Sequence, residues 1–254
     1  MPFESLGEYI TALEGIGQLK RVRTKVSADL EIAEILRRLM YKVDQPAVLF
    51  ENVEGHKYPV LGNAFGSLNR LKIALGLEDF SEIGERLSMI SRMRVPSTIF
   101  GKLKMLPKLS EIADYSPKYV ESGPVNDVVL NAIEASIELL PVTKSFPNDA
   151  GRFITFGVTV TKNPETQIQN LGVYRLQILG PKKAIMHWQI HKRGALHYQM
   201  NMEENMKTEV AIIIGAEPAV VFSAIAPVPE GMDKYLFAGI TRKRGIKLVT
   251  VSYT

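Results

Sequence analysis

The sequence contains no cysteine, a single tryptophan and no long apolar run. Without cysteine there is no disulfide, no thiolate nucleophile and no zinc–thiolate site. No apolar stretch approaches the roughly 20 residues that a membrane-spanning helix needs. The opening residues MPFESLGEYITALEG have neither the basic nor the apolar region of a secretory signal. We therefore expect no membrane association and a cytoplasmic location.

The sequence also lacks a strong excess of one charge. It has 31 Lys and Arg and 27 Asp and Glu, which gives a net charge of +4. Nucleic-acid-binding proteins usually concentrate basic residues and interleave them with exposed aromatics, whereas here the basic residues are spread along the chain. We expect no nucleic-acid partner. A mildly basic protein attracts an anionic cofactor or a carboxylate substrate equally well.

The first part of the 254 residues alternates helix and strand signals. Apolar residues recur at helical spacing over 3–14 and 29–42, and Asp29 is placed to cap the second of these helices. Further elements follow along the chain: strands at 47–53 and 58–62 around the turn EGHK, then helices at 67–76 and 80–92. This pattern predicts an N-terminal α/β domain over residues 1–95.

Residues 93–124 show no sustained periodicity of apolar residues. Four prolines and two glycines interrupt them, at Pro96, Gly101, Pro107, Pro117, Gly123 and Pro124. We interpret 96–124 as an irregular connection between two domains.

The third part, 125–254, is rich in strand signals. The predicted strands are 127–130, 152–162, 172–180, 184–192, 208–216 and 246–253, interrupted only by short helices near 217–225 and 232–240. Pro181-Lys182-Lys183 joins two of these strands into a predicted hairpin. Such a density of antiparallel strands favours a barrel or a closed sheet, and hence an α+β protein.

Three motifs lie close together in this part: T-K-N-P-E-T at 161–166, N-x-G-x-Y-R at 170–175 and H-W-Q-I-H-K-R-G-A at 187–195. In this order and spacing they resemble the flavin-binding core of the UbiD family of decarboxylases. Residues 46–70 are similar to the N-terminal domain of that family, and 215–242 to the segment that closes its cofactor-phosphate site. The resemblance covers nearly all of this chain but only part of a family member.

The resemblance implies a split β-barrel of the flavin-reductase type that binds prenylated FMN, supplied by a separate flavin prenyltransferase. It also implies reversible decarboxylation of an aromatic or α,β-unsaturated carboxylic acid. The cofactor holds the electrons left behind when carbon dioxide departs, while the protein orients the substrate. In the family, manganese or magnesium bridges the protein to the cofactor phosphate, with potassium alongside.

Site residues follow from the motif positions. Asn170 and His191 match the metal ligands of the family, and Arg175 matches the arginine that contacts the cofactor and holds the substrate carboxylate through paired hydrogen bonds. The positions that line the flavin in the family are Val173, Tyr174, His187, Trp188, Gln189, Lys192 and Arg193. Taken alone, each has an ordinary structural explanation: a turn asparagine, a hydrogen-bonded histidine, a surface arginine or a core tryptophan.

The sequence departs from the family where a third metal ligand, a glutamate, is expected, because Lys234 occupies that position. An ammonium group cannot ligate a cation and is repelled by one nearby. Either Lys234 itself neutralises the cofactor phosphate, which is our hypothesis, or Asp233 or Glu230 takes over as the ligand.

Family members also continue beyond the strand at 246–253, where two catalytic acids and an oligomerising C-terminal domain follow. General acid–base chemistry needs a protonatable group within hydrogen-bond reach, and none in this sequence aligns with those acids. We expect the lone chain to be catalytically incomplete. It is a subunit of a split, oligomeric enzyme, a truncation, or a non-catalytic scaffold; a reductase using ordinary FMN is the other alternative. We favour the split enzyme because the motifs and periodicity remain mutually consistent.

Overall fold

The N-terminal part of the chain forms a small sheet flanked by helices. The computed structural model describes residues 3–91, 113–228 and 232–250. In its first part the elements are α1 (Leu6–Gly15), β1 (Leu19–Val22), α2 (Glu31–Leu39), β2 (Ala47–Phe50), β3 (Val60–Gly62), α3 (Leu68–Leu75) and α4 (Ser81–Ser91). The middle strand β2 runs parallel to β1 and antiparallel to β3. All four residues of β2 are buried, as expected for a strand covered on both faces.

The predicted helices and the two predicted strands of this part are confirmed with shorter bounds, and β1 is an addition. The capping role predicted for Asp29 is wrong, because α2 starts at Glu31 after Leu30, which has φ 67° and makes no side-chain cap. The backbone around Asp29 pairs instead with Lys144, through Leu30 N–H to Lys144 O at 3.0 Å and Lys144 N–H to Ala28 O at 3.0 Å. A tertiary pairing has therefore displaced the local cap.

In the remaining part, the structure describes short strands together with the helices α6, α7 and α8. Its elements are β4 (Lys118–Tyr119), the 3₁₀ turns η1 (Pro124–Asn126) and η2 (Ile137–Leu139), β5 (Phe153–Ile154), β6 (Val158–Lys162), β7 (Gln169–Val173), β8 (Leu176–Gly180), β9 (Lys183–Met186), α6 (Arg193–Glu203), β10 (Ala211–Ile213), α7 (Pro218–Ile225), α8 (Lys234–Arg242) and β11 (Lys247–Leu248). Among the described residues no helix is long and apolar enough to cross a bilayer. The α+β class is confirmed.

Two long predicted strands are each split into two. The strand predicted at 152–162 becomes β5 and β6, and the strand predicted at 172–180 becomes β7 and β8. β6 and β7 belong to the sheet β10-β6-β7, whereas β5 and β8 belong to the sheet β5-β8-β9. The chain changes sheets at Gly157, where a Cβ atom would lie 2.9 Å from Ile212 Cγ2, and at Tyr174–Arg175. These paired breaks place Arg175 at a corner between two sheets.

Other predictions for this part are corrected. The strand expected at 127–130 is wrong, because those residues are exposed and form no ladder. The strand expected at 184–192 ends at Met186, and the sequence analysis missed α6, whose buried residues Gly194, Ala195, His197 and Asn201 lie on one helical face. The hairpin around Pro181-Lys182-Lys183 is confirmed as β8–β9. Most of the predicted connection 96–124 lies outside the described residues.

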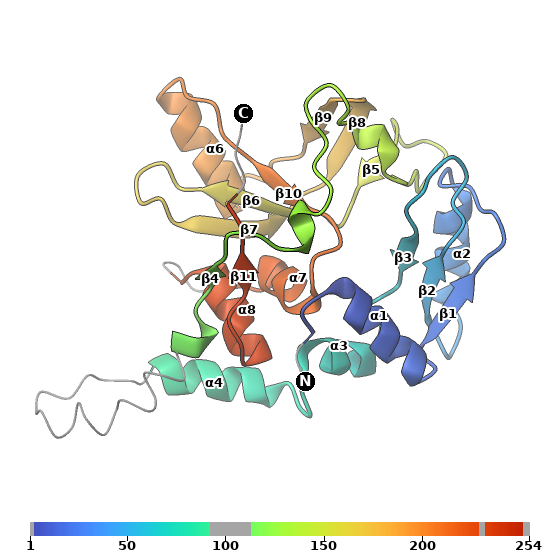
Figure 1. Cartoon of the computed structure of the whole chain (residues 1–254), viewed down its shortest axis with the longest axis horizontal. Helices are drawn as coiled ribbons and strands as arrows, with labels where there is room; N and C mark the ends of the chain where they lie inside the picture. The colour runs from blue at the N-terminus through green and yellow to red at the C-terminus, as the bar shows by residue number, and fades with distance from the viewer. Residues whose placement is uncertain (1–2, 92–112, 229–231, 251–254) are drawn as a thin grey trace, which may run out of the picture.

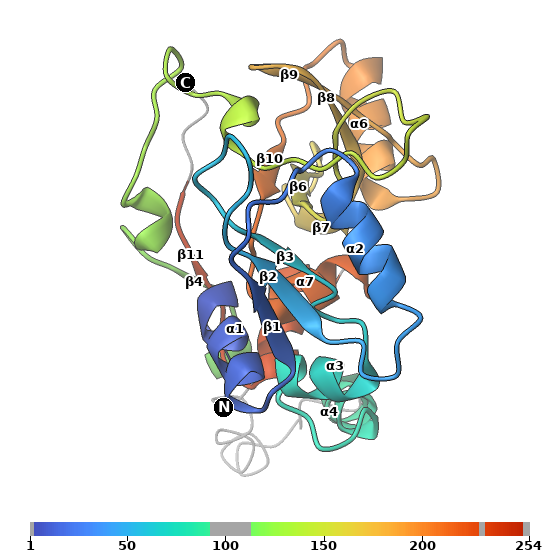
Figure 2. The same cartoon turned by 90° about the vertical axis from the view of Figure 1, so that its right-hand side faces the viewer.

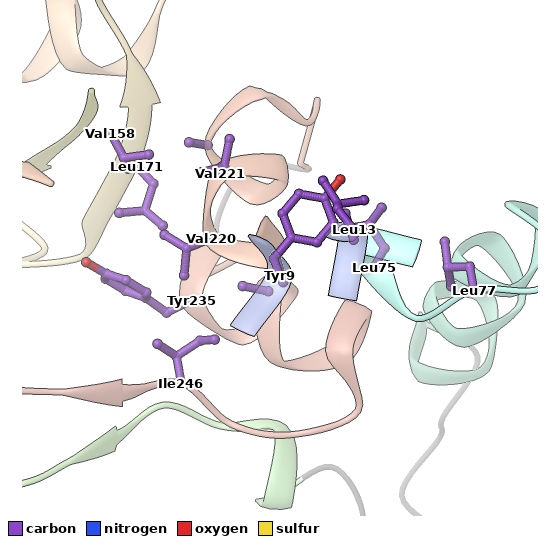
Figure 3. Close-up of a cluster of buried hydrophobic side chains, with 14 of the residues drawn as sticks. Tyr9, Leu13, Leu75, Leu77, Val158, Leu171, Val220, Val221, Tyr235 and Ile246 are labelled. Carbon is purple, nitrogen blue, oxygen red and sulfur yellow. The ribbon is translucent and has the colours of Figure 1, made fainter. Parts of the chain in front are cut away.

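The described strands form four sheets of two or three strands, none of them closed. The split barrel is therefore not confirmed and stays a prediction, as does the division into domains at 1–95 and 125–254. One hydrophobic cluster is shared by both predicted domains and includes Tyr9, Leu13 and Leu75 together with Val158, Leu171 and Val220 (Figure 3). In Figure 1, α7 lies between the β6–β7 strands and the helices α1 and α3.

Arg242 ties the two ends of the described chain together. Its side chain is 5% exposed and donates to the carbonyl oxygens of Phe3, Arg244 and Gly245 at 3.0, 2.9 and 3.0 Å. It also lies 3.6 Å from the carboxylate of Glu217, which accepts from Ala219 N–H and Val220 N–H and so caps α7. A buried charge satisfied in this way is costly to remove, because its partner is left unpaired.

We predict that Arg242→Met lowers the free energy of unfolding by about 3–5 kcal/mol, since it leaves Glu217 buried without its counter-charge. The matched control is Lys243→Met. Lys243 is exposed and pairs with Glu82 at 3.8 Å, so its loss should change stability by less than about 0.5 kcal/mol. Urea titrations followed by circular dichroism would measure both. Equal effects of the two substitutions would contradict this account.

Candidate functional site

The predicted site residues lie at five places in the described structure. Asn170 and Val173 lie on β7, and Tyr174 and Arg175 occupy the break before β8. Residues 187–192 form the irregular stretch between β9 and α6. Arg193 begins α6, and Lys234 begins α8.

Tyr174, Trp188 and Tyr198 form an aromatic cluster in this region. The ring of Trp188 meets Tyr174 edge-on at 5.1 Å between centroids and stacks on Tyr198 at 5.6 Å. The hydroxyl of Tyr174 accepts from Gly194 N–H at 2.9 Å, and burial raises the pKa of this phenol. A Cβ atom at Gly194 would lie 2.5 Å from that hydroxyl and 2.8 Å from Trp188 Cζ3, so only glycine permits this approach.

Three cations converge beside the aromatic cluster. Lys192 Nζ donates to Val173 O at 3.0 Å and lies 5.2 Å from the centroid of the Tyr174 ring. Arg193 donates to Val228 O at 3.0 Å, and Lys234 Nζ to Ala224 O at 3.0 Å.

The charges of these three side chains influence one another. Burial, together with the nearby charges of Arg193 and Lys192, lowers the pKa of Lys234 to about 8. None of the three forms an ion pair with a carboxylate in the described parts of the chain. A group of like charges without a counter-charge favours the binding of an anion.

Arg175 is exposed at the corner between the sheets. Its guanidinium carbon lies 5.2 Å from the centroid of the Phe153 ring, and its carbonyl oxygen accepts from His187 N–H at 2.9 Å. Tyr174 and Leu176 are buried on the opposite side, as strand alternation predicts. Arg175 therefore presents its donors to solvent, where a carboxylate can reach them. His187 and Gln189 are exposed as well.

The two predicted metal ligands have different surroundings. Asn170 is buried, and its Nδ2 donates to Thr161 Oγ1 at 3.5 Å; Thr161 Oγ1 in turn lies 3.0 Å from Nδ1 of buried His197. His191 is exposed in the turn before α6.

Across the described parts of the chain, no group of three or more His, Asp or Glu could hold a metal ion. Asp233 is used as the cap of α8, accepting from Tyr235 N–H at 2.6 Å. Glu230, the other alternative ligand, lies outside the described residues, and the described residues alone do not supply the ligands of a divalent ion.

Thr161 and His197 are polar residues of the site that the sequence analysis did not assign. The register of the β6–β7 hairpin places Thr161 opposite Asn170, a pairing that the T-K-N-P-E-T turn could have indicated. His197 lies one helical turn after Arg193, on the helix α6 that the sequence analysis did not predict. Its position at the site could not be read from periodicity alone.

Two family models match the chain. Residues 118–254 match the UbiD model, described as the 3-octaprenyl-4-hydroxybenzoate carboxy-lyase Rift-related domain. Residues 10–87 match the model of the 3-octaprenyl-4-hydroxybenzoate carboxy-lyase N-terminal domain. Together the two matches cover most of the sequence.

Longer proteins are similar in sequence to this chain. An uncharacterized protein of Aquifex aeolicus is 43% identical over 248 residues, which cover 97% of this chain and 51% of that protein. One of Archaeoglobus fulgidus is 42% identical over 249 residues, which cover 98% of this chain and 50% of that protein. The chain thus spans about half the length of the curated relatives that it matches.

Solved structures share the fold. The vanillic acid decarboxylase of Sedimentibacter hydroxybenzoicus (ShVdcCD), in its closed form, superposes with a TM-score of 0.84 at 26% identity, over 100% of this chain and 52% of that one. An evolved dimeric form of the UbiD-class enzyme HmfF from Pelotomaculum thermopropionicum, in complex with prFMN, gives a TM-score of 0.82 at 23% identity, over 99% of this chain and 54% of that one.

We predict that the stability of the protein falls with acid partly through His197. Burial, and then the charge of Arg193, lowers the pKa of this histidine below its ordinary value of 6.5. The folded state therefore binds the proton less readily than the unfolded state. The stability contribution is complete above pH 6.5 and is lost as the pH falls through the folded-state pKa.

The test is to compare the wild type with His197→Gln, which keeps a polar side chain but cannot titrate. Urea unfolding at several pH values between 7.5 and 5 should show a smaller loss of stability for the variant. The same dependence of the free energy of unfolding on pH in both proteins would contradict this prediction.

Proposed function

The chain belongs to the UbiD family of carboxy-lyases, and we propose that it is the prenylated-FMN-binding part of a decarboxylase or carboxylase. The observation that carries the proposal is a group of three cations beside the aromatic cluster, Lys192, Arg193 and Lys234, which form no ion pair among the described residues. Such a site suits a ligand that has a planar ring system at one end and a phosphate at the other. The substrate is an aromatic or α,β-unsaturated carboxylic acid.

The three cations would hold the cofactor phosphate. Each now donates to a single backbone carbonyl oxygen, and Lys and Arg have further donors available for phosphate oxygens. The planar part of the cofactor would lie along Val173, Tyr174, His187, Trp188 and Gln189. When bound, prenylated FMN supplies an acceptor for the electron pair that departing carbon dioxide leaves behind.

Lys234 would take the place of a metal ion at the phosphate. The described residues do not provide the ligands for a divalent cation, and Asp233 is occupied by the α8 cap. A half-buried ammonium group supplies one fixed positive charge without any bound ion. Asn170 and its partners Thr161 and His197 would then shape the site through hydrogen bonds, without coordinating a metal.

Arg175 would hold the substrate carboxylate through two parallel hydrogen bonds, and it stays charged throughout the reaction. The proton chemistry would come from acids on a second polypeptide, equivalent to the half of the relatives that this chain does not span. This chain would thus bind the substrate carboxylate, and its partner in an oligomer would supply the remaining residues of the active site.

The direct test is the identity of the bound cofactor. Protein purified without oxygen from cells that co-express a flavin prenyltransferase should carry stoichiometric prenylated FMN, identified by the mass of the released ligand. Ordinary FMN under these conditions would favour the reductase alternative, and protein without any flavin would favour a scaffold.

The role of Lys234 predicts metal-independent recognition of phosphate. Wild-type protein should bind FMN at least about tenfold more tightly than riboflavin, because charge-assisted hydrogen bonds to the phosphate are strong. This preference should be the same in EDTA and in manganese, and Lys234→Met should remove most of it. The matched control, Lys247→Met, changes an exposed lysine that pairs with Glu4 at 3.5 Å and should leave the preference intact. Flavin fluorescence quenching measures all of these affinities, and a clear gain of FMN affinity with manganese would refute the proposal.

A further inference from the structure

The side chain of Arg175 is exposed, yet an aromatic ring orients it. Its guanidinium carbon lies over the ring of Phe153, 5.2 Å from the ring centroid. Among the described residues the same side chain forms no ion pair and no hydrogen bond. A long, exposed arginine side chain otherwise samples many rotamers. The ring of Phe153 is therefore the described group that limits the motion of this arginine.

The register of two strands places these side chains together. β5 and β8 are antiparallel, with Phe153 opposite Gln177 and Ile154 opposite Leu176. Arg175 comes directly before the paired residues of β8, so it lies diagonally across from Phe153 on the same face of the sheet. Diagonal neighbours are within reach of aromatic and long side chains. The contact thus follows from the strand pairing.

The backbone that carries the ring is itself held in place. Phe153 N–H donates to Thr143 O at 3.0 Å, and the strand is also paired with β8. Lys144, the residue after Thr143, accepts from Leu30 N–H at 3.0 Å, which connects this backbone to the N-terminal part of the chain. A functional side chain is positioned most precisely when its supporting residues are fixed. Phe153 meets that condition.

An aromatic ring is a suitable support for an arginine that binds a carboxylate. The face of the ring attracts the cation through its quadrupole. An Asp or Glu in the place of Phe153 would instead occupy the paired N–H donors of the guanidinium and offset its charge. With Phe153 in this place, the charge and the N–H donors of Arg175 remain available to a ligand.

We propose that Phe153 is a positioning residue, which holds the guanidinium of Arg175 in the orientation that receives the substrate carboxylate. The proposal rests on the proposed function in one respect, because that function assigns the carboxylate to Arg175. Phe153 acts through Arg175 and does not take part in the chemistry itself.

A second pair of a cation and a ring provides the matched control. Phe80 lies between α3 and α4, and Lys72 Nζ is 5.8 Å from the centroid of its ring. Figure 2 shows α3 and α4 at one end of the molecule and the β8–β9 hairpin, together with α6, at the other. Phe80→Leu therefore removes the same kind of contact at a place that holds no predicted site residue.

The first test measures the motion of the Arg175 side chain by NMR relaxation, in the full chain without flavin. The order parameter of its Nε–Hε group should exceed that of Arg152, which is exposed and forms no ion pair among the described residues. Phe153→Leu should lower the value for Arg175 to that for Arg152. Phe153→Tyr should keep the wild-type value, because tyrosine also presents the face of a ring. Arg175→Lys assigns the resonance.

The second test measures carboxylate binding by the flavin-loaded chain, with benzoate as the probe and benzamide as its neutral counterpart. The wild type should prefer benzoate. Phe153→Leu should reduce this preference about two- to fivefold, as expected for the loss of an exposed cation–π contact. Phe153→Tyr and Phe80→Leu should keep the preference. Titrations followed at the Arg175 Nε–Hε resonance measure the affinities.

An order parameter of Arg175 that is no higher than that of Arg152 in the wild type would overturn the proposal without any variant. Equal order parameters, or an equal preference for benzoate, in the wild type and Phe153→Leu would also overturn it. If Phe153→Leu frees Arg175 but the wild type shows no preference for benzoate, the orientation by Phe153 stands and the proposed function loses its carboxylate-binding residue. If the chain takes up no flavin, the first test alone decides.

Discussion

Burial of helix α7 is the constraint on which the rest of the structure depends. Six of its eight residues are buried, and Ser223 is its single polar residue, so the helix has no polar face. A helix that is apolar all round must be surrounded by protein. Residues of β6 and β7 and residues of α1 and α3 pack with those of α7 in one hydrophobic cluster, which joins the two parts of the chain (Figure 3). Glu217 and Arg242 then satisfy the polar start of this helix inside the protein.

The position of the candidate site follows from that arrangement. Helix α8 packs on α7, and Ser223 of α7 donates to the carbonyl oxygen of Lys234, so the first residue of α8 is fixed beside the cations of α6. Placing three like charges together is unfavourable in the absence of a ligand, as the lowered pKa of Lys234 indicates. An anion would relieve that repulsion, and this is the physical basis of the proposed preference for a phosphate-bearing ligand.

The same molecule has a well-packed interior and an uncovered side. The core around α7 and the smaller cluster between α2 and β2 satisfy their apolar residues within the chain. The segment after β4 does not, although its backbone is formed. The chain therefore forms its main core around α7 and leaves large apolar side chains of this segment exposed.

Much of the local structure could be predicted from the sequence. Helical spacing predicted α1 to α4, turn residues predicted the β8–β9 hairpin, and the motifs around Asn170, Tyr174 and Lys192 predicted the candidate site. These features depend on neighbours in the chain, which a sequence displays directly. Only the tertiary structure decided where strands change sheets, because the breaks at Gly157 and Tyr174 follow from the packing of two sheets. Tertiary pairing with Lys144 also displaced the cap expected at Asp29, and the helix α6 arises where Gly194 must pass close to Tyr174. The polar chain from Asn170 through Thr161 to His197, and the convergence of Lys234 with Lys192 and Arg193, join residues far apart in the sequence, and such proximity exists only once the core has formed.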